Sequence, residues 1–152
     1  MMNAMIENMY NTYLGIRNSY KAAEAANNEA GKEAARETYK ALQTMLKGMD
    51  KEFQTVYRLY EDARDNGRDY IDIHECIFDK DACEIVAAFH QYGVERFTMS
   101  STWSGATEIA WLFTCQHYKI TGMEMVVTDG DATDFEGNTH PTLKPAYVFE
   151  RV

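Results

Sequence analysis

Apolar residues recur at alternating spacings of three and four along the first sixty-odd positions, which is the period of a packed helix. The first stripe contains Ile6, Met9, Tyr13, Ile16, Tyr20 and Ala23. After Asn27-Asn28 a second stripe contains Ala35, Tyr39, Leu42, Leu46, Met49, Phe53, Val56, Tyr60 and Ala63. Because asparagine favours helix ends and left-handed turns, the pattern predicts two antiparallel helices joined by a tight turn.

Gly48 lies inside the second stripe, where a glycine costs a helix about 1 kcal/mol relative to alanine. The apolar rhythm nevertheless continues through Gly48 without a change of phase. We therefore predict one long helix over residues 29–65, about 55 Å in length, which ends at Asn66-Gly67. Since this helix is longer than the first, its later part must pack on the second half of the chain.

From residue 67 onward the pattern predicts strands alternating with helices. We expect strands at 70–77, 94–99, 119–128 and 146–149. One helix is expected from Asp79 or Asp81 to Tyr92, and another after a cap at Ser101, Thr102 or Ser104. An alternation of this kind implies right-handed crossovers and a parallel core, with the last strand added antiparallel.

The predicted fold class is therefore α/β, with α+β as the alternative. A helical hairpin at 1–66 precedes a βαβαββ unit at 67–152 with a mixed, mainly parallel sheet, and the two form one continuous domain. A chain of 152 residues suits one domain with an appendage. No stretch approaches a membrane span, the first residues lack a basic signal region, and three cysteines suggest no disulfide framework. We expect a cytoplasmic protein of a bacterial host.

The net charge of −9 is concentrated in the second half of the chain. Residues 61–84 contain nine acids and three bases, a net charge of −6. Direct binding of nucleic acid needs clustered lysine and arginine, so it is not expected, whereas an acidic face can attract a basic protein. The candidate partner-binding residues are Asp62, Asp65, Asp69, Asp72, Glu75, Asp79 and Asp81. The simpler alternative is that these acids only keep a small protein soluble.

A zinc site is the second candidate, because thiolate and imidazole together suit this ion. His74 and Cys76 would point the same way on a strand, and Cys115 and His117 repeat the pair in reverse near the end of a helix. On a regular helix Cys115 and His117 would diverge by about 200°, so the helix must have frayed there. Buried free cysteines and surface histidines are the alternative explanation.

Three further patterns indicate no catalytic site. The segment Ser100–Gly105 joins a strand to a helix, where anions bind, but it lacks the P-loop spacing. The acids of the 129–136 segment could suggest a calcium-binding loop. The glycine and the glutamate that such a loop needs at its sixth and twelfth positions are missing, so we expect a solvated hairpin loop. Cys83 and Cys115 have no evident base as partner. An enzyme is therefore not expected.

The run GRDYIDIHECIFDKDACEIVAAFHQYGVERFTMSSTWSGATEIAWLF carries a family resemblance, together with VYRLYEDARDNG before it and TDFEG and PAYVF after it. Over residues 53–150 it resembles small acidic uncharacterised proteins of Firmicutes mobile elements. Proteins of this size, acidity and origin include anti-CRISPR proteins, which block type II Cas nucleases. The resemblance implies a non-enzymatic inhibitor that binds such a nuclease through its acidic surface and hinders nucleic-acid loading. The alternative is a zinc-stabilised structural or regulatory protein with an unrelated partner.

Overall fold

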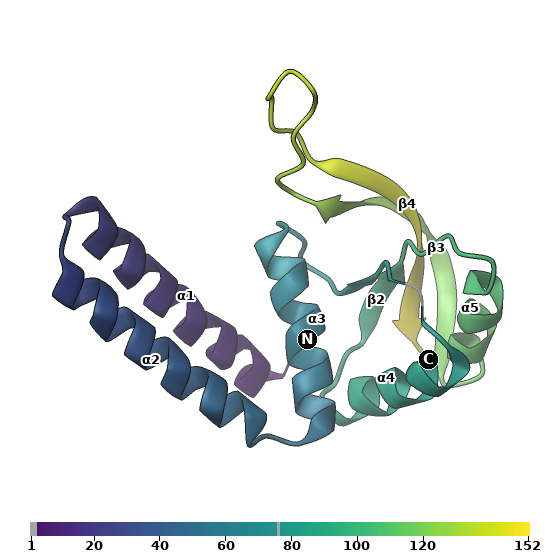
Figure 1. The fold of residues 1–152 in the computed structure, drawn as a ribbon. Helices are drawn as coiled ribbons and strands as arrows, with labels where there is room; N and C mark the ends of the chain where they lie inside the picture. Colours follow the sequence, from purple (N-terminus) through teal and green to yellow (C-terminus); the bar gives the residue numbers. More distant parts are fainter. Residues whose placement is uncertain (1–2, 76) are drawn as a thin grey trace.

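The protein is described by a computed structural model that covers residues 3–75 and 77–152. Its helices and strands, in chain order, are α1 (Ala4–Ala25), α2 (Glu29–Lys47), α3 (Lys51–Asp65), β1 (Asp72–Ile73), α4 (Asp79–Gln91), β2 (Arg96–Met99), α5 (Ala106–Thr114), β3 (Tyr118–Asp129) and β4 (Thr142–Arg151). The helices α1 and α2 form an arm at one side, and the remaining elements build the body (Figure 1). None of the helices in the described ranges is long and apolar enough to cross a membrane.

The predicted helical hairpin is confirmed for α1 and α2, which pack against each other along their lengths (Figure 1). The turn between them uses both asparagines. Asn27 takes a positive φ of 50°, and the Asn28 side chain accepts a hydrogen bond from the Gly31 amide at 2.9 Å, which caps α2. Asparagine tolerates the left-handed region better than most residues, so this dipeptide determines where the chain reverses.

The single helix predicted over 29–65 is wrong, because the chain breaks between α2 and α3. Gly48 follows the end of α2, and the Asp50 carboxylate accepts a hydrogen bond from the Phe53 amide at 2.7 Å, which starts α3. Asp50 also accepts a hydrogen bond from the hydroxyl of Tyr92 at the end of α4, with oxygen–oxygen distances of 2.7 and 2.9 Å. These contacts redirect the chain, so α3 packs mainly on α4 and belongs to the body rather than to the arm.

The sheet is mixed, as predicted, and its strand order is β1-β2-β4-β3. It is not mainly parallel, however, because only β1 and β2 pair in parallel, whereas β2–β4 and β3–β4 are antiparallel. The position of β4 explains the difference. Because β4 pairs with both β2 and β3, it lies between them and leaves β3 at the edge of the sheet. The far part of β3 and β4 extends beyond the body as a two-stranded ribbon (Figure 1).

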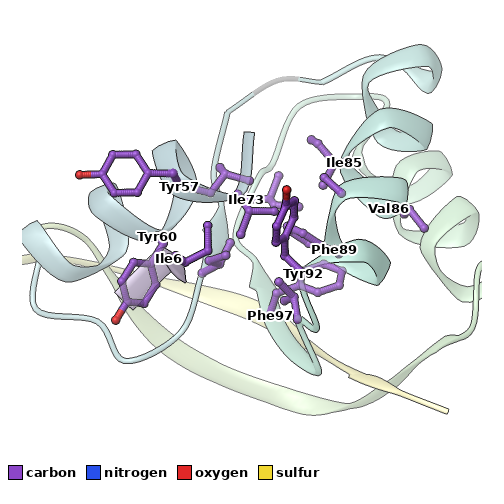
Figure 2. Packing of buried hydrophobic residues seen from close by; sticks show 14 of the residues in the cluster. Ile6, Tyr57, Tyr60, Ile73, Ile85, Val86, Phe89, Tyr92 and Phe97 are labelled. Atoms are coloured by element: carbon purple, nitrogen blue, oxygen red, sulfur yellow. The ribbon is translucent and has the colours of Figure 1, made fainter. Parts of the chain in front are cut away.

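The core lies between this sheet and the helices α4 and α5. Phe97 of β2 is its centre, with ring centroids of Phe89, Phe113, Tyr118 and Phe149 at 4.8 to 5.0 Å. Each fully buried ring of this size contributes about 1.5–3 kcal/mol to stability. Ile6 of α1 and Tyr60 of α3 extend the same cluster toward the arm (Figure 2).

The start of α5 differs from the prediction of a hydroxyl cap. Gly105 occupies the cap position of α5, so no side chain at this position accepts a hydrogen bond from the first amides of the helix. The Trp103 ring lies so close to Gly105 that a Cβ atom there would fall 2.1 Å from it. Glycine is needed at this position because the indole ring takes the space of a side chain.

Candidate functional site

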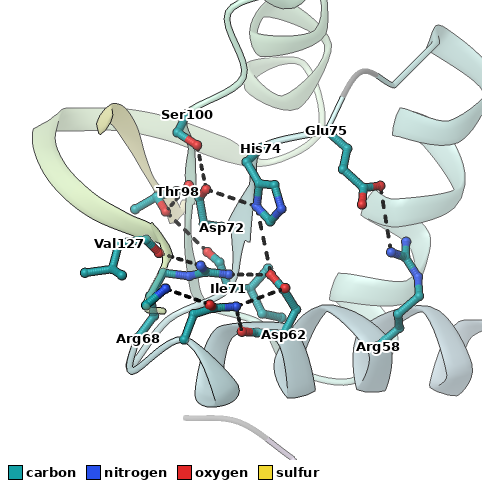
Figure 3. Close-up of polar contacts among 12 residues, drawn as sticks. Arg58, Asp62, Arg68, Ile71, Asp72, His74, Glu75, Thr98, Ser100 and Val127 are labelled. Atoms are coloured by element: carbon teal, nitrogen blue, oxygen red, sulfur yellow. Dashed lines mark hydrogen bonds and ion pairs between the residues drawn. The ribbon is translucent and has the colours of Figure 1, made fainter. Parts of the chain in front are cut away.

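The carboxylate of Asp72 organises the end of the parallel strand pair. Its side chain is fully buried and accepts hydrogen bonds from the hydroxyls of Thr98 and Ser100, each at 2.6 Å (Figure 3). Burial alone would raise the pKa of Asp72, but contacts from His74, Ser100 and Thr98 outweigh it and hold the pKa below its ordinary value. Asp72 is therefore a buried anion that joins β1 to the end of β2.

His74 follows β1 and faces two carboxylates. Its Nδ1 lies 3.6 Å from Asp72 Oδ2 and 3.9 Å from Asp62 Oδ2. At these distances the contacts are ion pairs rather than hydrogen bonds. The polar contact with Asp72 raises the pKa of His74 above its ordinary value, although partial burial acts against it. A protonated His74 would thus bridge β1 and α3.

Arg68 connects Asp62 of this network to β3. Its buried guanidinium donates from Nη2 to Asp62 at 2.6 Å and from Nη1 to the Val127 carbonyl at 2.5 Å (Figure 3). A charge-assisted contact of this kind is stronger than one between neutral groups. Arg68 therefore holds the end of α3 against β3, although these elements are far apart in the sequence.

A pocket of about 340 Å³ opens above this network, between α3 and the segment that follows β1. The carboxylates that line it are those of Glu61, Asp62, Asp65, Asp72 and Glu75. Arg58 and His74 are the basic residues among the described lining, and Arg58 lies 3.9 Å from Glu75. We call this concave surface the acidic pocket. It lies at the carboxyl end of parallel strands, which is where α/β proteins commonly bind ligands.

The acidic residues predicted to bind a partner fall into three groups. Asp62, Asp65, Asp72 and Glu75 line the acidic pocket. Asp72 is buried beneath the others, which the sequence could not show, because a strand pattern does not reveal which side of β1 is covered. Asp69 is exposed beside Arg64, and Asp79 and Asp81 lie in the first turn of α4, where Asp81 accepts the Phe78 amide at 3.2 Å.

Within the pocket, Asp62 and Asp65 already have partners. Asp65 accepts hydrogen bonds from the Tyr10 hydroxyl at 2.9 Å and from Arg17 at 3.4 Å, both on α1. Sequence reasoning missed Glu61 and Arg58, although both lie on α3 within one turn of Asp62. A helical projection of α3 would have identified them, because residues three or four apart share a face.

A search of protein families matches residues 55–151 to a domain of unknown function, DUF7698. The chain belongs to this family. Comparisons with curated proteins and with solved structures found no match. The DUF7698 segment begins within α3 and ends with β4, so it contains the pocket-lining residues, Arg68 and the ribbon, while α1 and α2 lie outside it.

Of the predicted zinc ligands, His74, Cys115 and His117 lie within the described residues, and these three are not brought together. His74 follows the carboxyl end of β1, whereas His117 precedes β3, whose first residue pairs with Arg151 beyond the amino end of β2. Cys115 is exposed at the end of α5, and Cys76 lies outside the described residues. Across 3–75 and 77–152 no group of three or more histidines, cysteines or acids is arranged to hold a metal ion. Because one of the four predicted ligands is not described, the zinc site stays a prediction.

The start of the Ser100–Gly105 segment, considered above as an anion site, is occupied by internal contacts. The amides of Ser100 and Ser101 both donate to the Ile73 carbonyl, at 3.0 and 3.2 Å, so they do not face an anion. The Ser100 hydroxyl donates to Asp72 and not to His74. In a catalytic triad the histidine lies between serine and aspartate, whereas here the aspartate lies between the other two. Ser100 is therefore not activated as a nucleophile by His74 in this arrangement.

Proposed function

We propose that the protein acts without catalysis, by binding a basic, nucleic-acid-handling protein of its bacterial host through the acidic pocket. A type II Cas nuclease, bound in the cytoplasm before nucleic acid is loaded, is the partner that best fits this proposal. The observation that carries it is the pocket itself, where five carboxylates surround a concave space with Arg58 and His74 as the lining bases. A lysine or arginine side chain of the partner would complete this arrangement.

The rim and the floor of the acidic pocket have different roles in this proposal. On the floor, Asp72 and Asp62 are held by donors of the protein itself. At the rim, Glu75 is 68% exposed and its contact with Arg58 is long, at 3.9 Å. A weakly paired, exposed carboxylate can exchange its partner at little cost. We therefore assign the contact with a partner to Glu75, together with Glu61, which lines the same pocket from α3.

Cas nucleases hold nucleic acid in positively charged channels, so an acidic protein can compete for the same surface. Opposite charges accelerate such an encounter and select the partner, and salt screens them. The proposal therefore predicts tighter binding to the guide-free nuclease than to the loaded one, with affinity that falls as salt rises.

The test compares two variants with equal net charge for binding to a purified type II Cas nuclease, measured by biolayer interferometry. Glu61→Lys with Glu75→Lys reverses the rim, and Glu33→Lys with Glu37→Lys makes the same charge change on α2. The rim variant should lose about tenfold or more in affinity, and the α2 variant about twofold or less. Equal affinities of the rim variant and the wild type would refute the assignment of the pocket. If the wild type does not bind, the choice of nuclease fails.

A further inference from the structure

The loop at the end of the ribbon is an ordered turn. Asp134 Oδ1 accepts hydrogen bonds from the amides of Glu136 and Asn138, both at 2.9 Å, and the Asp134 amide donates to the Asn138 carbonyl at 2.9 Å. Gly137 takes a φ of 83°, which favours glycine. Side-chain contacts of this kind replace backbone pairing and hold a short loop in one shape. We call residues 129–141 the ribbon tip.

This turn places one aromatic side chain entirely in solvent. The relative exposure of Phe135 is 112%, above that of any other large apolar residue in the described chain. Burying a phenylalanine side chain contributes roughly 1.5–3 kcal/mol, so leaving it exposed forgoes stability. A polar residue would serve the turn equally well, because the hydrogen bonds come from Asp134 and from the backbone. Folding of the turn therefore does not explain Phe135.

Exposed apolar residues also lie along one face of the ribbon. Met123 is paired with Tyr147, and Met125 lies two positions further along β3. Alternate residues of a strand and residues directly opposite each other share a face, so these three side chains and Leu143 lie together. Their relative exposures are Met123 62%, Met125 59%, Leu143 52% and Tyr147 41%. On the opposite face, Val126 and Ala146 are buried.

The charge around Phe135 indicates the chemistry of what it contacts. The ribbon tip contains Asp129, Asp131, Asp134 and Glu136 and no lysine or arginine, a net charge of −4. An interface typically combines a central aromatic anchor with a polar rim of complementary charge. An acidic rim selects a basic counterpart and disfavours nucleic acid and anionic lipid surfaces.

We infer that the ribbon tip is a protein-binding device, in which Phe135 enters an apolar pocket of a partner protein whose rim carries lysine or arginine. The ordered turn lowers the entropy lost on binding, because the anchor is already presented in one conformation. This surface lies outside the acidic pocket, and the inference does not depend on that pocket. The two are nevertheless connected, since Asn66, which lines the pocket, accepts a hydrogen bond from the Gly130 amide at 2.9 Å.

Photo-crosslinking in the organism that encodes the protein tests this inference. Phe135→p-benzoylphenylalanine places a photoreactive ring at the tip, and Trp111→p-benzoylphenylalanine places it on α5, where Trp111 is 68% exposed. We expect an adduct at position 135 that is about tenfold stronger than at position 111, with the crosslinked peptide containing apolar residues next to lysine or arginine. Added wild-type protein should suppress the adduct, whereas Phe135→Ala protein should not.

Four results would overturn the inference: no adduct above the position 111 control, an adduct with a second copy of the chain, an adduct with nucleic acid, or equal competition by wild type and Phe135→Ala. We expect Phe135→Ala protein to stay folded, so the competition experiment compares two folded proteins. Because Phe135 makes no buried contact, the melting temperature of Phe135→Ala should stay within about 2 °C of the wild type.

Discussion

The acidic pocket and the ribbon tip carry similar charge in opposite shapes. The pocket is concave and places five carboxylates around Arg58 and His74, whereas the tip is convex, has four carboxylates with no lysine or arginine, and projects Phe135. The pocket suits an entering basic side chain. The tip suits insertion into a partner, with its acids facing a basic rim. Similar acidity therefore has different consequences, which depend on whether the surface encloses space or protrudes.

The two regions also differ in how their carboxylates are held. Asp72 and Asp65 accept hydrogen bonds from side chains that are distant in the sequence, such as Ser100 for Asp72 and Tyr10 for Asp65. At the tip, Asp134 accepts them from amides within four residues. The pocket can form only together with the whole fold, while the tip organises itself locally. This difference predicts which substitutions affect global stability.

The largest effect is expected for Asp72→Ala. The substitution removes the carboxylate that accepts from the buried hydroxyls of Thr98 and Ser100, and it removes the nearer of the two carboxylates that face His74. Loss of one member of a buried polar network costs about 3 kcal/mol in free energy of unfolding. Urea denaturation measures this change. Asp69→Ala is the matched control, because that carboxylate is 86% exposed, and it should change stability by less than about 0.5 kcal/mol. Similar losses for both variants would contradict the role of Asp72.

A smaller effect is expected from pH, through His74. Its pKa is raised in the folded protein, so the stabilisation is fully present below its unfolded value of about 6.5 and is lost as pH rises through the folded value. Asp72 and Asp62 attract the protonated ring, and Arg68 opposes them. The free energy of unfolding, compared with His74→Gln, should fall by less than about 1 kcal/mol between pH 6 and 8.5. His140→Gln, at the exposed tip, controls for the loss of one histidine. A stability difference that grows with pH would be inconsistent with the pairing.

Local sequence patterns predicted the elements of the fold better than their arrangement. The apolar stripes and Asn27-Asn28 located the helical hairpin, because those signals act within one or two turns. The break at Asp50 was missed, since its cap is stabilised by Tyr92 from α4 and the apolar phase happens to continue across it. The place of β4 between β2 and β3 depends on packing around Phe97 and Phe149, which no local pattern contains.

The candidate site was also predicted only in part, because it depends on contacts between segments that are distant in the sequence. Composition indicated an acidic region, and four of the seven acids predicted to bind a partner line the pocket. It could not distinguish the buried Asp72 from the exposed Asp69, because only the folded environment separates them. Phe135 was overlooked because a polar loop around one aromatic residue resembles an ordinary solvated turn until the exposure of the ring is known.

The central claim is that the acidic pocket, and not acidity as such, accepts a basic side chain. Titration of arginine methyl ester into ¹⁵N-labelled protein, followed by NMR, tests it most directly and without a partner. The expected effect is weak, with a dissociation constant of about 1 mM or more, so the shifts must be followed to saturation. We predict saturable shifts at residues 58–62 and 72–75, which the Glu61→Gln and Glu75→Gln double variant removes, and smaller, non-saturating shifts at residues 129–141. Equal shifts at both regions, or shifts that the double variant keeps, would contradict the account.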